Sequence, residues 1–486
     1  MKKIMLVILD GFGEAPEGRG NAVKNANMPY LNSLKEKYPF TFLKTEGNAS
    51  GLPEGQTGAS EPGHITIGAG RRVNQPLEEI NQAFKTDDIL QNFHFKEFLE
   101  ASKGKRVHLL GMLSDGGVHS HIDHLNKLLE IFNEHEVFVH AIGDGRDVRE
   151  QSIARYVSEV RGGKMASLVG RYYAMDRDQN WDRVKVAYDL YTKGEGERIS
   201  GITDEIYRDV ETDYYLPAFV FDDFEPISDE DFVLFYNFRS DRAQELTEAF
   251  TGPDFAHFER DVFFKKNFLA FGPYTLNNAP NAFPPRSVKN NLGFCWQKNG
   301  LKQLRIAETE KFAHVTFFFN SQIKEPFADE DRVLISSLKC ASYAEKPKMS
   351  AGEVTERLVY ELGRDFYDVV VLNYANADLV GHSGVYEKAK EACEYLDQCL
   401  ARLIPVAQEK GFDIMITADH GNSDEMIYPD GSPNPSHSLN PVICLLVTDR
   451  EVVFHEHAEL SDIAPTLLDM QGLGIPDDMT GKSFIK

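Results

Sequence analysis

Short apolar runs that end in polar, glycine-containing segments recur along the chain. Residues 4–9 are followed by Asp10-Gly11, and residues 107–113 are followed by a Ser-Asp-Gly-Gly segment. The same arrangement occurs at 137–142, 232–236, 369–372 and 414–416. Continuous apolar runs are typical of strands buried on both faces, as in parallel sheets that helices cover. Such sheets bind ligands beyond the carboxyl ends of their strands, where these polar segments lie.

Helical patterns between these runs complete the prediction of an α/β fold. Residues 387–403 have apolar positions about every three to four residues, as in an amphipathic helix. Residues 51–64 form a glycine-rich loop that leads into a helix, for which Ser60 is the predicted N-cap. Two proline-containing segments, 73–76 and 283–286, indicate connections between domains, although ordinary turns explain them equally well.

The charge balance and the cysteines exclude several classes of protein. The chain has 52 Lys and Arg against 76 Asp and Glu, and its net charge of −24 argues against nucleic acid or an anionic membrane as a partner. No apolar run reaches the roughly 20 residues that cross a bilayer, and the run after Met1-Lys2-Lys3 is too short for a signal peptide. The five cysteines are odd in number and lack C-x-x-C spacing, so we expect free thiols in a cytoplasmic protein.

Carboxylates and imidazoles that could bind metal ions follow several of the predicted strands. Asp378 and His382 are four residues apart and can share one face of a helical turn. The other candidates are Asp10, Asp419, His420 and His437. Mixed carboxylate and imidazole sets suit Mn²⁺, Zn²⁺ or Fe²⁺, and two such sets suggest a two-metal site. Each residue alone is explained as well by helix capping or by a structural hydrogen bond.

Ser60 and a group of arginines are the remaining candidates. A hydroxyl at a helix start, close to a metal, could act as a nucleophile, although composition alone favours a simple cap. The arginines lie in separate segments at Arg146, Arg171, Arg177, Arg239 and Arg242. They suit a phosphate or carboxylate pocket, but neighbouring aspartates allow structural salt bridges instead. The histidine-rich segment 118–124 could bind a metal, position a substrate or cap the following helix.

Taken together, these segments closely resemble the 2,3-bisphosphoglycerate-independent phosphoglycerate mutases, a branch of the alkaline phosphatase superfamily. The resemblance covers essentially the whole chain, and its most specific segments are residues 113–121, 144–147, 170–178, 237–239, 308–311, 373–382 and 417–422. It implies an alkaline-phosphatase-like discontinuous α/β domain with an inserted α/β transferase domain. Residues 1–75 and 286–486 would form the metal-binding phosphatase-like domain, and residues 76–285 the substrate-binding transferase domain.

The resemblance also implies a role for each candidate residue. One Mn²⁺ would be held by Asp378, His382 and His437, and the other by Asp10, Ser60, Asp419 and His420. Ser60 would accept the phosphoryl group. The implied substrate contacts are His121, Arg146, Asp147, Arg171, Arg177, Arg239, Arg242 and Lys311. Asp147 is our candidate for moving protons at the glycerate hydroxyls, and Lys311 for aiding the oxygen that leaves.

The implied activity is the interconversion of 3-phosphoglycerate and 2-phosphoglycerate in glycolysis, through a phosphoserine and without bisphosphoglycerate. Closure of the two domains about the proline-containing segments is expected to keep water from the phosphoserine. We expect a cytoplasmic monomer that contacts neither nucleic acid nor membrane. Divalent ions other than Mn²⁺ would also suit the ligands.

Some residues near Ser60 depart from the family pattern. Thr57, Ala59 and Pro62 stand where the family usually has Met, Asn and Val. Thr57 adds a second hydroxyl close to the expected nucleophile, and the rate could change as a result. Two other functions compete with the mutase. One is a metal-dependent phosphomonoesterase or phosphopentomutase of the same superfamily, and the other is a non-catalytic phosphometabolite-binding protein.

Overall fold

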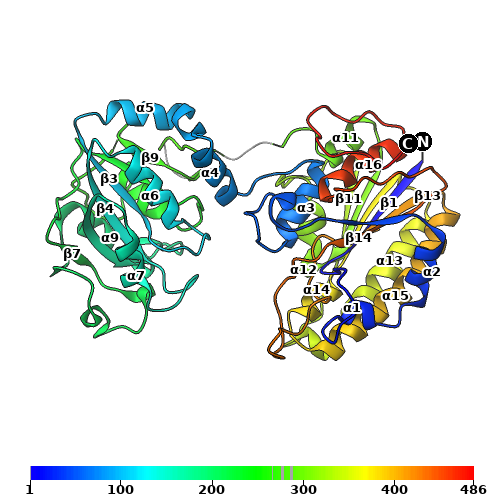
Figure 1. Ribbon diagram of the computed structural model, residues 1–486. Coiled ribbons are helices and arrows are strands. Elements are labelled where there is room, and N and C mark those ends of the chain that lie inside the picture. Colours follow the sequence, from blue (N-terminus) through cyan, green and yellow to red (C-terminus); the bar gives the residue numbers. More distant parts are fainter. Residues whose placement is uncertain (1, 265, 275–278, 285–287) are drawn as a thin grey trace. The chain divides into compact units, whose positions relative to one another are not determined.

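The chain divides into two compact units. A computed structural model describes residues 2–264, 266–274, 279–284 and 288–486. Unit 1 comprises Met1–Gln75 and Ser287–Lys486, and unit 2 comprises Pro76–Arg286. Each unit is built around one seven-stranded sheet (Figure 1). Unit 1 is therefore assembled from both ends of the chain, and unit 2 is continuous.

The sheet of unit 1 is mostly parallel and has the strand order β11-β10-β12-β1-β13-β14-β2. Its strands are β1 (Lys3–Leu9), β2 (Phe40–Leu43), β10 (Gln303–Glu308), β11 (Glu330–Ile335), β12 (Val369–Tyr374), β13 (Phe412–Thr417) and β14 (Val442–Val447). Only the β13–β14 and β14–β2 pairs are antiparallel among the described strands of this sheet. The central strands β12, β1 and β13 therefore end at the same edge.

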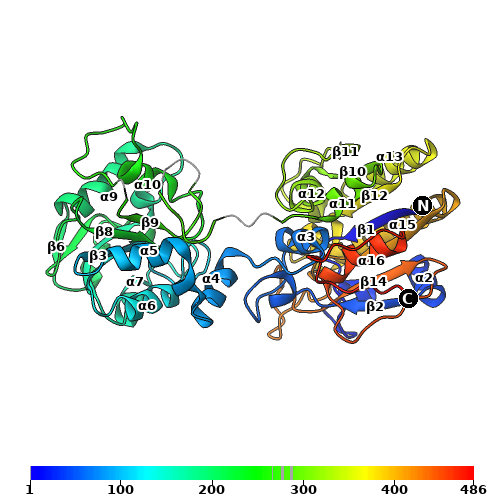
Figure 2. The same ribbon diagram turned by 90° about the horizontal axis from the view of Figure 1, so that it is seen from above.

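Helices cover both faces of this sheet (Figures 1 and 2). Those on one face include α2 (Pro29–Lys37), α13 (Ala351–Gly363) and α15 (Tyr386–Glu409), and those on the other include α3 (Ser60–Ala69), α11 (Leu292–Lys298) and α16 (Ile463–Met470). Shorter helices are α1 (Ala22–Asn25), α12 (Thr309–Ala313) and α14 (Asn376–Gly381). Every residue from Ile4 to Leu9 is fully buried between these layers, as the apolar run predicts. The predicted helix at 387–403 lies within α15.

The sheet of unit 2 has the strand order β6-β7-β5-β4-β3-β8-β9. Its strands are β3 (Arg106–Met112), β4 (Glu136–Gly143), β5 (Lys164–Gly170), β6 (Glu197–Ile199), β7 (Phe219–Phe221), β8 (Phe232–Phe235) and β9 (Phe268–Ala270). Its helices are α4 (Pro76–Lys85), α5 (Phe93–Ala101), α6 (Ile122–Ile131), α7 (Ile153–Glu159), α8 (Arg171–Ala174), α9 (Trp181–Lys193) and α10 (Gln244–Thr251). The neighbouring strands β5, β4, β3 and β8 are parallel, so their carboxyl ends also share one edge.

Alternate residues of the central strands in unit 2 enter two separate apolar cores. In β8, Phe232 and Leu234 pack with α4, α5, α6 and α7, whereas Val233 and Phe235 pack with α9 and α10. This is the pattern of a strand buried on both faces, and it confirms the prediction made from the continuous apolar runs.

The predicted cap of α3 is wrong by one residue. The helix begins at Ser60 itself, the N-cap position is occupied by Ala59, and no side chain caps this end. The Ser60 hydroxyl instead points toward the side chains of Asp10 and His420. After α3, the segment 73–76 runs directly into α4, with Gln75 N donating to Gly51 O at 2.7 Å. Pro285 and Arg286 of the second proline-containing segment lie outside the described residues.

One buried carboxylate takes the place of the missing cap on α2. The N-cap of this helix, Met28, supplies no side-chain hydrogen bond. Asp397 of α15 accepts hydrogen bonds from Tyr30 N at 3.1 Å and Leu31 N at 2.7 Å. Asp397 therefore joins two helices that are far apart in the sequence, and it places negative charge at a helix start.

We expect Asp397→Asn to lower the free energy of unfolding by about 1–3 kcal/mol, because a buried charge-assisted cap is lost. Urea unfolding followed by circular dichroism would measure the change. Glu394→Gln in the same helix is the control, since Glu394 accepts one hydrogen bond from Asn27 N at an exposed position. Equal losses in the two variants would contradict the proposed capping by Asp397.

Candidate active site

The metal-type residues predicted from the sequence meet at one edge of the unit 1 sheet. Asp10 follows β1, Asp378 lies in α14 directly after β12, and Asp419 and His420 follow β13. Because β12, β1 and β13 are adjacent and parallel, their polar ends converge. His437 reaches the same edge from a loop between β13 and β14.

Asp378, His382 and His437 bring three ligand-type atoms together. Oδ1 of Asp378 lies 3.2 Å from Nε2 of His382 and 3.2 Å from Nε2 of His437. The two Nε2 atoms are 3.0 Å apart. Ligand atoms bound at about 2.1 Å to one ion lie roughly 3.0–3.5 Å from one another, so these atoms fit a single cation.

Asp10, Ser60, Asp419 and His420 form the adjoining group. Ser60 Oγ donates to Asp10 Oδ1 at 3.1 Å and lies 2.9 Å from His420 Nε2. His420 Nε2 lies 3.5 Å from Asp10 Oδ1 and 3.6 Å from Asp419 Oδ2. Asp419 Oδ2 is buried and makes no hydrogen bond among the described residues, although Nδ1 of His64 lies 3.3 Å from it. A buried carboxylate oxygen left in this way suits a cation as its missing partner.

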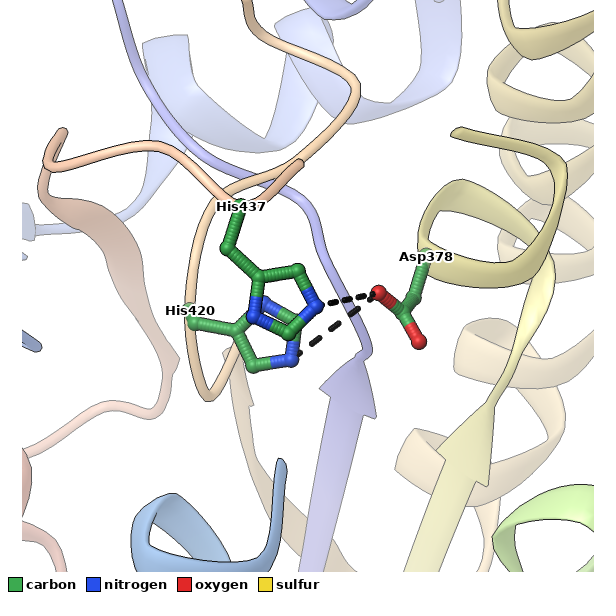
Figure 3. Close-up of side chains that lie close together, drawn as sticks. All are labelled: Asp378, His420 and His437. Carbon is green, nitrogen blue, oxygen red and sulfur yellow. Dashed lines mark ion pairs between the residues drawn. The ribbon is translucent and has the colours of Figure 1, made fainter. Parts of the chain in front are cut away.

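His420 connects the two groups. Its ring stacks on that of His437 with centroids 3.9 Å apart, and its Nε2 lies 4.0 Å from Asp378 Oδ1. Figure 3 shows the rings of His420 and His437 both directed at the Asp378 carboxylate. The structure thus groups His420 with Asp378 and His437 as well as with Asp10 and Asp419.

The orientation of His382, His420 and His437 leaves Nε2 of each ring available to bind a cation. Nδ1 of His382 faces Pro435 O at 2.7 Å, and Nδ1 of His437 faces Gly58 O at 2.7 Å. Nδ1 of His420 lies 3.2 Å from Gly421 O. A carbonyl can only accept, so Nδ1 donates and Nε2 keeps its lone pair. This arrangement is usual for metal-binding histidines, and the donor set therefore fits divalent cations.

Lys311 contacts both groups of ligands. It lies in α12, which runs into a π-helical turn, η5 (His314–Phe318). Its Nζ is 2.6 Å from Asp10 Oδ1, 2.7 Å from Asp378 Oδ2 and 2.8 Å from Ser60 Oγ. The side chain is only 4% exposed, so this ammonium is a buried counter-charge to the carboxylates. Sequence motifs suggested Lys311 as a substrate contact, whereas its contacts in the structure are with Ser60 and the ligand carboxylates.

The charges in this cluster perturb one another strongly. Burial would lower the pKa of Lys311, but the charges of Asp10 and Asp378 outweigh it and raise that pKa. Burial would raise the pKa of Asp378, but the charge of Lys311 outweighs it and holds that pKa well below its usual range. Burial and the charge of Asp419 raise the pKa of Asp10. The lysine alone thus does not balance the carboxylates, and a bound divalent cation would favour ionised Asp10.

Two residues without a predicted role connect Asp10 to Asp419. Asn373 Nδ2 donates to Asp10 Oδ2 at 2.8 Å and lies 3.1 Å from His64 Nε2. Nδ1 of His64 lies 2.8 Å from Ser60 O and 3.3 Å from Asp419 Oδ2. Both side chains are buried. Asn373 belongs to segment 373–382, which resembles the mutase family. His64 could not be recognised from the sequence, because it meets Asn373 of β12 only when α3 packs against that strand.

The arginines predicted to bind an anion lie in unit 2, beyond the carboxyl ends of its strands. Arg171 Nη1 contacts Asp144 Oδ1 at 2.7 Å and Asp147 Oδ2 at 2.6 Å. Asp241 pairs with Arg177 at 3.1 Å and with Arg239 at 3.0 Å. Some of these arginines therefore form the salt bridges that the sequence left open. Arg177 and Arg239 are still 47% and 51% exposed, which leaves guanidinium surface for a ligand.

The remaining unit 2 residues differ in their surroundings. Arg242 donates to Met175 O at 3.1 Å, and burial together with the charge of Arg177 lowers its pKa. Arg146 is exposed. His121 is the N-cap of α6 and accepts from Asp123 N at 3.1 Å, which is one of the roles considered for the histidine-rich segment. His124 in the same segment faces Asn81 Oδ1 at 2.8 Å.

Comparison with known proteins assigns the class first. A family model described as the Metalloenzyme superfamily matches residues 2–474. The 2,3-bisphosphoglycerate-independent phosphoglycerate mutase of Clostridium botulinum is 46% identical over 507 aligned positions, covering 100% of this chain and 99% of the relative. That of Acetivibrio thermocellus is 44% identical with the same coverage. A crystal structure of Leishmania mexicana phosphoglycerate mutase at low cobalt concentration matches 100% of this chain and 98% of its own, with 29% identity and a TM-score of 0.66.

The chain is therefore a metalloenzyme, and it belongs to the 2,3-bisphosphoglycerate-independent phosphoglycerate mutases, which are isomerases. The resemblance noted in the sequence motifs and the predicted α/β fold are both confirmed. The described residues contain no helix that is both long and apolar enough to cross a membrane.

We expect Lys311→Met to lower the thermal unfolding temperature of the metal-free protein by several degrees, because the buried carboxylates lose their counter-charge. Saturating Mn²⁺ should recover most of the loss, since a bound cation replaces that charge. Differential scanning calorimetry with chelator and with Mn²⁺ would measure both effects. Lys164→Met removes an exposed ion pair with Glu136 and should change neither value. A loss of the same size with and without Mn²⁺ would contradict the charge argument.

Proposed function

We propose that this chain interconverts 3-phosphoglycerate and 2-phosphoglycerate through a phosphoserine at Ser60, without bisphosphoglycerate. The observation that carries the proposal is the position of the Ser60 hydroxyl. Its oxygen lies within hydrogen-bond distance of Asp10, His420 and Lys311, at the start of α3. Family membership supports the same reaction. A serine that only capped the start of α3 would need none of these three partners.

Two Mn²⁺ ions per chain are the proposed cofactors. Asp378, His382 and His437 would hold one, and Asp10, Ser60, Asp419 and His420 would hold the other. Bound cations would lower the pKa of the Ser60 hydroxyl and offset the negative charge of the phosphoryl oxygens. Ligand distances near 3 Å support one ion in the first group. Oxygen and imidazole ligands suit several divalent metals, so selection depends on their supply.

Ser60 Oγ, deprotonated before the step with its proton released to solvent, attacks the phosphorus while the bond from phosphorus to the 3-oxygen of the substrate breaks. Asp147 is proposed to supply a proton to that oxygen and to remove one from the 2-hydroxyl for the return step. The 2-oxygen then attacks the phosphoserine, and Ser60 Oγ leaves. Lys311 donates a hydrogen bond to Ser60 Oγ at 2.8 Å, so it can stabilise the charge on this oxygen as it attacks and as it leaves.

The anionic groups of the substrate are proposed to be held by unit 2. His121, Arg146, Asp147, Arg171, Arg177, Arg239 and Arg242 are the proposed contacts, together with Lys311 of unit 1. Residues 1–75 and 286–486 would act as the metal-binding domain and residues 76–285 as the substrate-binding domain. We also retain a cytoplasmic monomer as the proposed state, with the five cysteines as free thiols.

A metal-dependent phosphomonoesterase is the competing function. Such an enzyme could use the same residues around Ser60, but it would release the phosphoryl group to water. It would have no need for an arginine cluster that holds glycerate after the first transfer. The ratio of 2-phosphoglycerate to free phosphate formed from 3-phosphoglycerate therefore distinguishes the two functions.

We expect Ser60→Ala to lower the rate of 2-phosphoglycerate formation by about 1,000-fold or more, because the nucleophile is lost. An enolase-coupled assay with 3-phosphoglycerate, with and without Mn²⁺ and without bisphosphoglycerate, would measure the rate. Thr57→Ala is the matched control, since Thr57 carries the other hydroxyl in this loop, and it should keep most of the activity. Full activity in Ser60→Ala would overturn the proposed intermediate, and free phosphate as the main product of the wild type would favour the phosphomonoesterase.

Asp147→Asn should lower kcat by about 100-fold or more, because an amide cannot exchange the proton in the way a carboxylate does. Bound metal, measured by atomic emission on the purified protein, should stay at the wild-type level, since Asp147 lies in the other unit from the metal-type residues. Normal turnover in this variant would remove the proton-transfer role from Asp147.

A further inference from the structure

His119 is a buried residue that the proposed reaction does not use. It lies in the segment between β3 and α6, and 3% of it is exposed. Its Nε2 lies 2.9 Å from Nη2 of Arg171. A guanidinium can only donate, so the imidazole accepts this hydrogen bond and carries its own proton on Nδ1. Burial and the charge of Arg171 lower the pKa of His119 to about 4, which keeps the ring neutral near pH 7.

The other side of the ring faces the second half of the arginine cluster. Nδ1 of His119 has no hydrogen-bond partner among the described residues and lies 4.0 Å from Oδ1 of Asp241, an oxygen that is also 3.0 Å from Arg239 Nε. Asp241 is the carboxylate that pairs with Arg177 and Arg239. The backbone adds a second connection, because Phe238 N donates to His119 O at 2.8 Å.

We propose that His119 is a positioning residue that joins the two halves of the arginine cluster and thereby sets its affinity for the phosphoglycerate anion. One half is Arg171 with Asp144 and Asp147, and the other is Asp241 with Arg177 and Arg239. The inference rests on the proposed function, because it assigns the cluster to that substrate.

A neutral imidazole suits this position because the cluster must be held together without losing its positive charge. Neighbouring guanidiniums repel one another, and the charge of Arg177 adds to the effect of burial in lowering the pKa of Arg242. A carboxylate at position 119 could also accept from Arg171, but its charge would oppose an incoming phosphate. The imidazole supplies the acceptor and adds no charge.

Two substitutions separate the roles of the two ring nitrogens. The side-chain amide of His119→Gln reaches the place of Nε2 and can accept from Arg171, whereas that of His119→Asn reaches only the place of Nδ1. We expect His119→Asn to raise KM for 3-phosphoglycerate by about 10-fold or more, with kcat changed by less than about threefold, because ground-state and transition-state binding weaken together. His119→Gln should stay within about threefold of the wild-type KM, because it keeps the acceptor for Arg171 and because the backbone bond from Phe238 N to His119 O still links the other half.

His124→Asn is the matched control. His124 is 2% exposed and follows five positions later, but it contacts Asn81 and the ring of Phe84 rather than an arginine. This variant should lose stability without a comparable rise in KM. Equal KM values for wild type and His119→Asn, or equal rises in the Asn and Gln variants, would overturn the inference. An inactive wild type would instead count against the proposed function.

A third variant tests the charge argument and serves if His119→Asn does not fold. His119→Glu keeps an acceptor for Arg171 but adds a negative charge. We expect its KM to rise by about 10-fold or more, and the rise should become smaller as salt screens the added charge. A KM equal to that of His119→Gln at low salt would show that the neutrality of His119 is unimportant, and would overturn this part of the inference.

Discussion

The site depends on balancing negative charge that is buried where three parallel strands end. Asp10, Asp378 and Asp419 are each at most 3% exposed, and one oxygen of each lies within 4.0 Å of Nε2 of His420. Carboxylates in such surroundings either take up protons or require cations. Lys311 supplies one positive charge from α12, and the imidazoles of His382, His420 and His437 complete a donor set that favours divalent ions. The proposed nucleophile is positioned by the same interaction, because Ser60 Oγ shares Lys311 with the carboxylates.

Unit 2 uses the same architecture for the opposite charge. Its parallel strands also end at one edge, but the side chains there are mainly arginines held by Asp144, Asp147 and Asp241. A chain with a net charge of −24 can attract a phosphorylated acid only through such a local excess of positive charge. Under the proposed function, unit 1 would therefore supply ligands for cations, and unit 2 would supply hydrogen-bond donors for anions.

The apolar pattern was sufficient to find strands with uninterrupted hydrophobic sequences, such as β1 and β12. It did not predict β10, because the charged Arg305 interrupts the apolar sequence of this strand. In the structure the Arg305 guanidinium is buried, and it contacts Gln303 and the rings of Trp296 and Phe319 instead of solvent. The ligand-type residues were recognisable because they directly follow strands or match family motifs. The positions of His64 and His119 were not, since their partners come from segments far away in sequence. The cap assigned to Ser60 was wrong for the same reason: distant partners, rather than the helix, orient its hydroxyl.

The uneven exposure of the metal-type residues has a kinetic consequence. His382 is 43% exposed and His437 is 17% exposed, whereas Asp10 and His420 are fully buried. An ion bound by the exposed histidines could gain or lose water ligands while the protein stays folded. An ion held among Asp10, Asp419 and His420 could leave only after local opening of the surrounding chain. The two positions would therefore exchange with the medium on different timescales, and a brief change in metal supply would reach the outer position first.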